Sequence, residues 1–109
     1  MICLIVLYKI FKDLPLYYFI KMSQLENQFN VAANDVKNFK TKPTDDELLC
    51  LYKYYKQATI GKCNTTKPWM INVVESTKWT AWNSLGNMSK EEAMKSYIKL
   101  VNELRLKCN

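Results

Sequence analysis

The chain has 109 residues, of which 24% are charged and 49% hydrophobic, so it is long enough for one domain with one modest core. It contains only two glycines and three prolines, which argues against a turn-rich β-sandwich. The formal net charge of +6 favours anionic partners, such as nucleic acid, acidic lipid or phosphorylated small molecules, without choosing among them.

Residues 1–21 differ from the rest of the chain. The apolar run from Ile2 to Tyr8 is far shorter than the roughly 18 residues that a membrane span requires. The segment lacks the basic start and cleavage site of a secretory signal, and it lacks the arginines of a mitochondrial presequence. We interpret it as an N-terminal extension, with Met22 as an alternative start, before a domain at residues 22–109. A targeting segment or membrane-surface anchor is the competing interpretation.

Capping signals predict two helices in the first half of the domain. The stretch from Ser23 to Glu26 has capping-box spacing and is followed by an apolar face that extends to about Lys40. A second capping box begins at Thr44, and the helix that it starts is expected to end at Gly61.

Two more helices are predicted in the second half. One extends from about Val73 to Leu85, where Trp79 and Trp82 are expected to be core anchors. The other starts at a third capping box, at Ser89, and continues nearly to the end of the chain. A turn-rich loop, residues 61–72, separates the two halves, and a loop of this length is often functional. The pattern predicts an all-α helical bundle.

Aromatic and basic side chains share the second predicted helix. Leu48, Leu51, Tyr52 and Tyr55 recur at helical spacing, and Lys56 lies one turn beyond Tyr52. A cation and two amphipathic rings beside an apolar stripe indicate a ligand that has both a planar aromatic part and negative charge.

Residues of other predicted helices could join this group. Lys37, Lys78 and Tyr97 would converge on it only if the helices meet as a bundle, which spacing alone does not show. The alternative is that the lysines are solvated and the tyrosines belong to the core with their hydroxyls in water.

Catalysis and metal binding have little support in the sequence. With no histidine, a general base near neutral pH would require a strongly shifted Lys, Glu, Asp or Cys. No C-x-x-C pair is present, so a zinc site would need all four distant cysteines, which we expect to be reduced in a cytoplasmic protein. We therefore predict no enzyme activity, no catalytic residues, no metal and no cofactor. The four cysteines are Cys3, Cys50, Cys63 and Cys108.

Five segments match one protein family in the same order. The block Tyr-x-x-Tyr-Lys-Gln-Ala-Thr-x-Gly, followed by Lys-Trp-x-Ala-Trp, is highly specific. With these segments the region from Phe29 to Leu104 resembles the acyl-CoA-binding protein family. The matching segments are residues 29–33, 40–43, 51–61, 78–83 and 89–98.

The resemblance implies an up-down-down-up four-helix bundle and, as ligand, a medium- to long-chain fatty acyl-CoA. In the family, residues matching Tyr52, Tyr55 and Lys56 contact the adenosine and 3′-phosphate end of CoA. The match to Lys78 supplies a phosphate-binding cation, and the match to Tyr97 contacts the nucleotide.

The resemblance also implies where the acyl chain binds. Lys37 matches a first-helix lysine near the ligand, and Ala33, Leu48 and Leu49 match positions that line the acyl groove.

Two residues depart from the family pattern. Trp69 stands where the family usually has glycine, so we expect a loop of different shape. Val74 stands where many members have a lysine near the phosphates, so we expect one cationic contact fewer and weaker CoA binding.

The leading hypothesis is a monomeric acyl-CoA carrier and pool former that supplies acyl-CoA-consuming enzymes, with at most transient membrane contact. One alternative is a module of a larger lipid-metabolism enzyme, such as an enoyl-CoA isomerase, of which this chain would be a fragment. Another is an acyl-CoA binder anchored to a membrane through residues 1–21. Nucleic acid is not expected as a partner, because no predicted helix concentrates Lys and Arg on one face.

Overall fold

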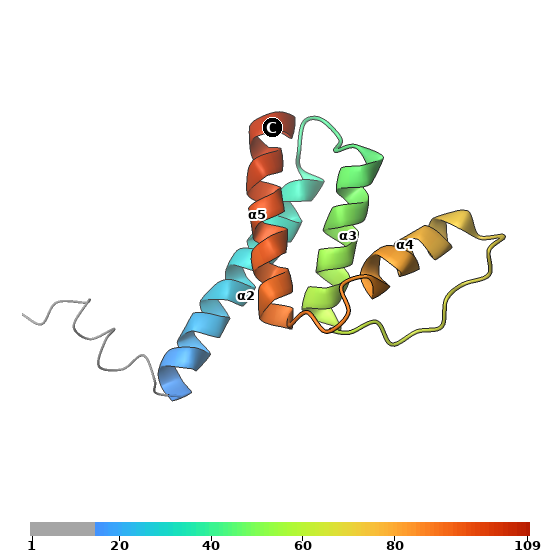
Figure 1. Cartoon of the computed structure of the whole chain (residues 1–109). Helices are drawn as coiled ribbons and strands as arrows, with labels where there is room; N and C mark the ends of the chain where they lie inside the picture. The colour runs from blue at the N-terminus through green and yellow to red at the C-terminus, as the bar shows by residue number, and fades with distance from the viewer. Residues whose placement is uncertain (1–14) are drawn as a thin grey trace, which may run out of the picture.

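The computed structural model describes residues 15–109, which form four helices and the connections between them. The helices are α2 (Pro15–Lys37), α3 (Asp45–Thr59), α4 (Val73–Asn83) and α5 (Lys90–Cys108). In Figure 1, α2 and α5 run upward and α3 and α4 run downward, so the predicted all-α, up-down-down-up bundle is confirmed. The apolar run near the N-terminus and Cys3 lie outside the described residues.

Side chains that cap backbone N–H groups determine where three helices begin. Thr44 Oγ1 accepts a hydrogen bond from the Glu47 N–H at 3.2 Å, and Glu47 Oε1 accepts one from the Thr44 N–H at 2.9 Å. Ser89 Oγ accepts from the backbone of Glu92 at 3.1 Å. The predicted starts at Thr44 and Ser89 are therefore confirmed. Asn72, which was not predicted as a cap, begins α4 in the same way.

The predicted helix start at Ser23 is wrong. Because α2 begins at Pro15, Ser23 and Glu26 lie inside it. The backbone N–H groups there bond carbonyl oxygens of the preceding turn, so they need no capping side chain. Leu16 and Phe19, in the added turns, are largely exposed and contribute little to the core. No helix within residues 15–109 combines the length and the apolar composition that crossing a membrane requires.

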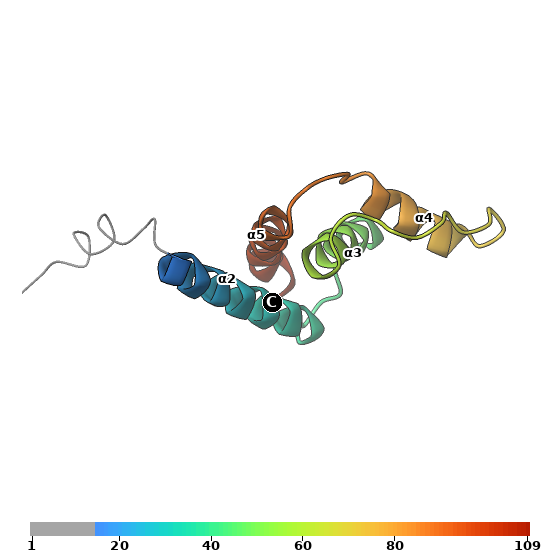
Figure 2. The same ribbon diagram turned by 90° about the horizontal axis from the view of Figure 1, so that it is seen from below.

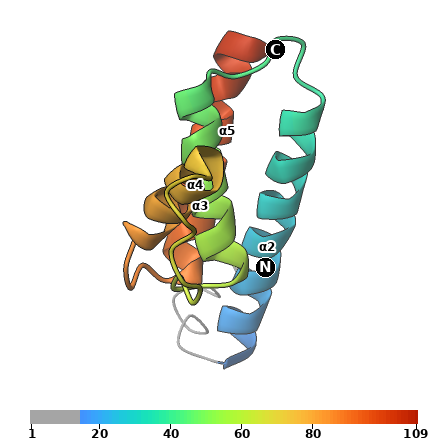
Figure 3. The same cartoon turned by 90° about the vertical axis from the view of Figure 1, so that its right-hand side faces the viewer.

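The central helix of the bundle is α5. Both α2 and α3 pack against it, and α4 packs on α3 away from α2 (Figures 2 and 3). Spacings of three and four residues place the buried side chains of α5 on one face. Together with residues of α2 and α3 they form a single core. The buried core residues are Phe29, Ala32, Leu51, Ala58, Ala93, Met94, Tyr97, Val101, Leu104 and Cys108.

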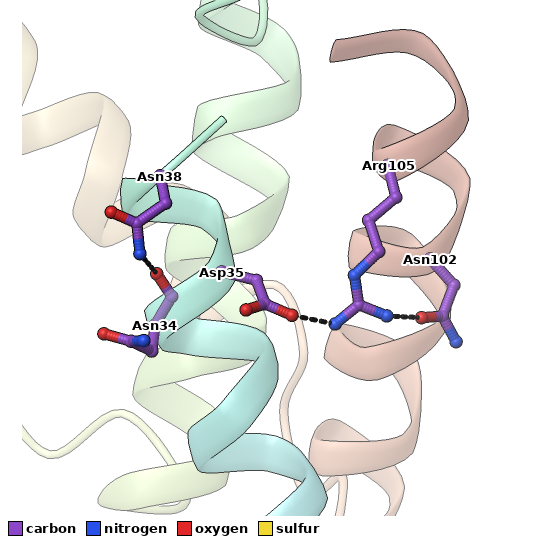
Figure 4. A network of polar contacts seen from close by, with 5 residues as sticks. All are labelled: Asn34, Asp35, Asn38, Asn102 and Arg105. Carbon is purple, nitrogen blue, oxygen red and sulfur yellow. Dashed lines mark hydrogen bonds and ion pairs between the residues drawn. The ribbon is translucent and has the colours of Figure 1, made fainter. Parts of the chain in front are cut away.

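A polar network sets how α2 lies on α5. The Arg105 guanidinium of α5 donates to the Asp35 carboxylate of α2 and to Asn102 of its own helix (Figure 4). Asn38 donates to the Asn34 carbonyl oxygen at 3.2 Å near the end of α2. Because Asp35 and Arg105 are partly exposed, the ion pair contributes only about 0–1 kcal/mol, and its main effect is on helix orientation.

The connection between α2 and α3 is joined to the C-terminal end of α5. The Thr41 N–H donates to the Cys108 carbonyl oxygen at 2.9 Å, and Lys107 Nζ lies 2.8 Å from Glu47 Oε1. The hydrogen bond from Lys107, together with those from Thr44, lowers the pKa of Glu47 to about 2.

This lowered pKa predicts an acid-dependent loss of stability. Glu47 stabilises the fold above its unfolded pKa of 4.5, and this contribution is lost as the pH falls from there through about 2. The difference in urea midpoint between the parent chain and Glu47→Gln should therefore shrink over that range.

Asp46→Asn is the matched control, because Asp46 lies in the same turn and forms no ion pair within residues 15–109. If the difference in urea midpoint between the parent chain and Glu47→Gln stayed constant from pH 6 to pH 2, the Glu47 carboxylate would not stabilise the fold through its charge.

Candidate functional site

A cavity of about 300 Å³ lies between α2 and α3, beside α5. We call it the tyrosine cavity, because one tyrosine of α5 and two of α3 form part of its wall. It brings together six of the nine predicted site residues, from three helices. The lining residues are Ala33, Val36, Lys37, Leu48, Leu51, Tyr52, Tyr55 and Tyr97.

Phe29 joins two of these tyrosines in an aromatic cluster. Its ring stacks on Tyr55 at a centroid distance of 5.6 Å and meets the edge of Tyr97 at 5.0 Å. Phe29 and Tyr97 are buried, whereas Tyr55 is 43% exposed. Since Phe29 covers one face of the Tyr55 ring, the exposed part of that ring can receive a planar ligand.

Tyr97 contributes a hydroxyl to the tyrosine cavity. Its ring is buried, it lines the tyrosine cavity, and no described residue hydrogen-bonds its hydroxyl. Burial, with a smaller contribution from Tyr55, raises the pKa of Tyr97 to about 12. The hydroxyl is therefore protonated at neutral pH and can donate a hydrogen bond to an anionic group.

A second cavity, of about 590 Å³, lies between α3 and α4, and we call it the α3–α4 cavity. Leu48 and Tyr52 line both cavities, so the two adjoin along α3. The α3–α4 cavity adds two more predicted site residues, Leu49 and Lys78. Its lining residues are Asp45, Asp46, Leu48, Leu49, Tyr52, Val73, Val74, Thr77 and Lys78.

Lys78 lines the α3–α4 cavity beside Tyr52, the tyrosine that both cavities share. Its Nζ lies 4.8 Å from the centroid of the Tyr52 ring and 3.5 Å from Glu75 Oε1. The cation–π contact holds the ammonium beside the tyrosine that both cavities share. The chain thus places a positive charge of α4 next to an aromatic ring of α3, as the predicted site requires.

The other two predicted lysines are less constrained. Lys56 lines neither cavity, and its Nζ lies 4.8 Å from the centroid of the Trp82 ring. Lys37 lines the tyrosine cavity from the last turn of α2. Neither forms an ion pair within residues 15–109, so both charges remain available to an anionic ligand.

The two predicted tryptophan anchors fasten the loop at residues 61–72. Trp82 is buried, as predicted, and its Nε1 donates to the Gly61 carbonyl oxygen at 2.9 Å. Trp79 is only half-buried and donates to the Thr65 carbonyl oxygen at 2.8 Å. Gly61 itself has a φ of 98°, which an L side chain rarely adopts, so glycine is required where α3 ends.

Gln57, in the block of α3 that carries the family resemblance, has a structural role. It is fully buried, and its Nε2 donates to the carbonyl oxygens of Gly86 and Met88 at 3.1 and 2.7 Å. These bonds fix the end of α3 to the connection between α4 and α5, and so position the helix that carries most of the site.

Some lining residues were not predicted, among them Asp45 and Asp46. Both lie in the first turn of α3, and both line the α3–α4 cavity. The signal was present for Asp45, because Asp45, Leu48, Leu49 and Tyr52 have i, i+3, i+4, i+7 spacing. Val73, Thr77 and Val36 were also missed, since their places depend on how the helices pack.

A larger cavity, of about 620 Å³, lies between α2 and α5. It contains none of the predicted site residues and no aromatic side chain. Its charged lining residues include Lys95, whose Nζ pairs with Glu91 Oε1 at 3.0 Å within α5. Lacking a ring on which a planar group could stack, it is a poorer site for a ligand of the predicted kind than the tyrosine cavity.

No described residues form a metal site. Residues 15–109 contain no group of three or more His, Cys, Asp or Glu that could hold an ion. The cysteines in this range, Cys50, Cys63 and Cys108, are free thiols.

Comparisons with known proteins give consistent matches over most of the chain. The family model described as acyl CoA binding protein matches residues 26–101. The chain is 47% identical over 79 residues to the acyl-CoA-binding protein of Dictyostelium discoideum, covering 72% of this chain and 94% of that protein. It is 45% identical over 80 residues to the acyl-CoA-binding protein of Gossypium hirsutum, covering 73% and 90%.

A solved structure shows the same fold. The crystal structure of Oryza sativa acyl-CoA-binding protein 2 aligns with a TM-score of 0.76 and 34% identity, covering 80% of this chain and 95% of that one. The chain therefore belongs to the acyl-CoA-binding protein family.

The aromatic cluster predicts a large effect of truncating Phe29. Because Phe29 is 3% exposed and touches Tyr55 and Tyr97, Phe29→Ala should lower the free energy of unfolding by about 3–5 kcal/mol. Phe19→Ala is the matched control, since Phe19 lies on the same helix and is 70% exposed; its effect should stay within about 0.5 kcal/mol. Equal urea midpoints for the two variants would contradict the central role of the cluster.

Proposed function

We propose that this chain binds medium- to long-chain fatty acyl-CoA non-covalently and acts as a monomeric cytoplasmic carrier and pool former. It would supply acyl-CoA-consuming enzymes without catalysing a step itself. One observation carries the proposal: in a member of this family, tyrosines and lysines of four helices gather along two adjoining cavities.

The nucleotide end of the ligand is assigned to Tyr52, Tyr55, Lys56, Lys78 and Tyr97. Adenine is planar and can stack on the exposed part of the Tyr55 ring. The phosphates of CoA suit lysines, which act as point charges, and the protonated Tyr97 hydroxyl can donate to one of their oxygens.

The acyl chain is assigned to Ala33, Leu48 and Leu49, with Lys37 near the ligand on α2. Leu48 and Leu49 lie roughly 10–12 Å along α3 from Lys56, at 1.5 Å per residue. The apolar and the cationic ends of the site are thus separated along one helix, as in the ligand itself. The carboxylates of Asp45 and Asp46 lie at the opposite end of α3 from Lys56, and they line the same cavity as Lys78.

The position of Val74 fits the effect that we predict for this departure from the family pattern. It is 67% exposed and lines the α3–α4 cavity, so an apolar side chain stands there instead of a lysine. We infer weaker contact with phosphate at this position and better contact with a hydrocarbon.

The binding domain is assigned to residues 22–109, and residues 1–21 to an extension. The family match, residues 26–101, lies inside this range. Leu16, Tyr18, Phe19 and Ile20 are all about half exposed or more, which supports a start of α2 that lies outside the core.

Calorimetric titration with palmitoyl-CoA tests the proposal. The parent chain should give saturable heat at micromolar concentration, and Tyr52→Ala or Lys56→Ala should weaken binding by about 1–3 kcal/mol. Lys53→Ala is the matched control, because Lys53 is on the same helix with its Nζ over the Tyr54 ring and lines neither cavity. No heat from the parent, or parent-like affinity in both site variants, would refute the assignment.

Affinity should also depend on the length of the acyl chain. Each buried methylene contributes about 0.8 kcal/mol, so binding should strengthen from octanoyl- to palmitoyl-CoA until the apolar cavity is full. The same titration with C8, C12 and C16 thioesters measures this. Equal affinities for all three would mean that only the CoA group is bound.

A further inference from the structure

The loop between α3 and α4 exposes five apolar side chains within six residues. Trp69, Met70 and Ile71 are 84%, 85% and 90% exposed, and Val73 and Val74 are 68% and 67% exposed. We call these five residues the apolar tip. A contiguous exposed apolar patch marks a surface that another phase or molecule covers.

The apolar tip has a defined shape. The Asn72 N–H donates to the Trp69 carbonyl oxygen at 3.0 Å, which closes a turn, and the Asn72 side chain caps α4. The exposed side chains of Trp69, Met70 and Ile71 therefore belong to a hydrogen-bonded turn that leads directly into the capped start of α4. The loop lies at the end of the molecule opposite the start of α2 (Figures 1 and 2).

The charge and composition of the loop favour a lipid bilayer as the partner of the apolar tip. Residues 61–74 include Lys62 and Lys67 and no acidic residue, and the next carboxylate along the chain, Glu75, pairs with Lys78. The carboxylates of Asp45 and Asp46 belong to α3, which forms the other side of the α3–α4 cavity. A tryptophan and aliphatic side chains flanked by lysines are typical of segments that enter the interface of an anionic bilayer.

A protein partner is a less suitable match for this surface. Standard protein interfaces cover about 800 Å² on each partner, with some 20–30 residues a side. The apolar tip offers five apolar residues on a protruding turn.

We propose that the apolar tip docks on bilayers that contain anionic lipid, with Trp69, Met70 and Ile71 inserted at the interface. This rests on the proposed acyl-CoA binding and extends it. Val73 and Val74 belong both to the tip and to the α3–α4 cavity. Docking therefore brings that cavity to the lipid surface, and an acyl chain can pass between bilayer and protein with little exposure to water.

Sedimentation of the full chain with vesicles of 70% phosphatidylcholine and 30% phosphatidylserine tests the docking. The triple variant Trp69→Ser, Met70→Ser, Ile71→Ser should lower the vesicle partition coefficient by about tenfold or more. Its affinity for palmitoyl-CoA in vesicle-free solution should stay within about twofold of the parent, because these residues line neither cavity. This second measurement separates the docking surface from the binding site.

The matched control replaces exposed apolar residues elsewhere, Val31→Ser with Leu106→Ser, which are 51% and 91% exposed. It should bind vesicles like the parent. A second control, Leu16→Ser with Phe19→Ser, tests the exposed start of α2. Brominated phosphatidylcholine should quench more fluorescence in the parent than in Trp69→Phe, since Trp69 is 84% exposed in the tip, whereas Trp82 is buried and Trp79 half-buried.

Three results would overturn the docking proposal: no vesicle binding by the parent, undiminished binding by the triple variant, or loss of binding only in the α2 control. A fourth result would also overturn the docking proposal. If the triple variant bound vesicles like the parent but delivered acyl-CoA more slowly to a consuming enzyme in vesicle-free solution, the partner of the tip would be a protein. Vesicle binding that depends on the tip, without any heat on titration with palmitoyl-CoA, would support the docking surface and refute the carrier function.

Discussion

Ring packing among Phe29, Tyr55 and Tyr97 joins α2, α3 and α5 beside the tyrosine cavity. Phe29 and Tyr97 belong to the core, and Tyr55 and Tyr97 line the cavity. Because Phe29 and Tyr97 are buried, the position of the Tyr55 ring follows from the packing of three helices. The shape of the proposed site is thus a consequence of the core, and a change in the core should alter ligand affinity as well as stability.

Charge is distributed unevenly along the two cavities. Asp45 and Asp46 lie where α3 begins, near the leucines, and share the α3–α4 cavity with Lys78, whereas Lys56 lies beside the Trp82 ring near the other end of α3. An amphipathic ligand with phosphates at one end would be oriented by this arrangement, since its anionic part is repelled from one end and attracted to the other.

Local chemistry made part of the fold predictable. The caps at Thr44 and Ser89 depend on side chains that bond their own backbone within three residues, so sequence spacing sufficed. The same spacing failed at Ser23, because the helix had already begun and no free N–H groups remained there. The placement of Lys78 over Tyr52 depends on how α4 packs against α3, which no local pattern encodes. Periodicity gave the face of α3, and only the family resemblance named a ligand.

The most direct test is to map backbone amide shifts of the isotope-labelled chain as palmitoyl-CoA is added. The account predicts the largest changes at Tyr52, Tyr55 and Tyr97 and around Lys78, where the two cavities adjoin. Changes confined to the larger cavity between α2 and α5, which Lys21 and Leu106 help to line, would contradict it.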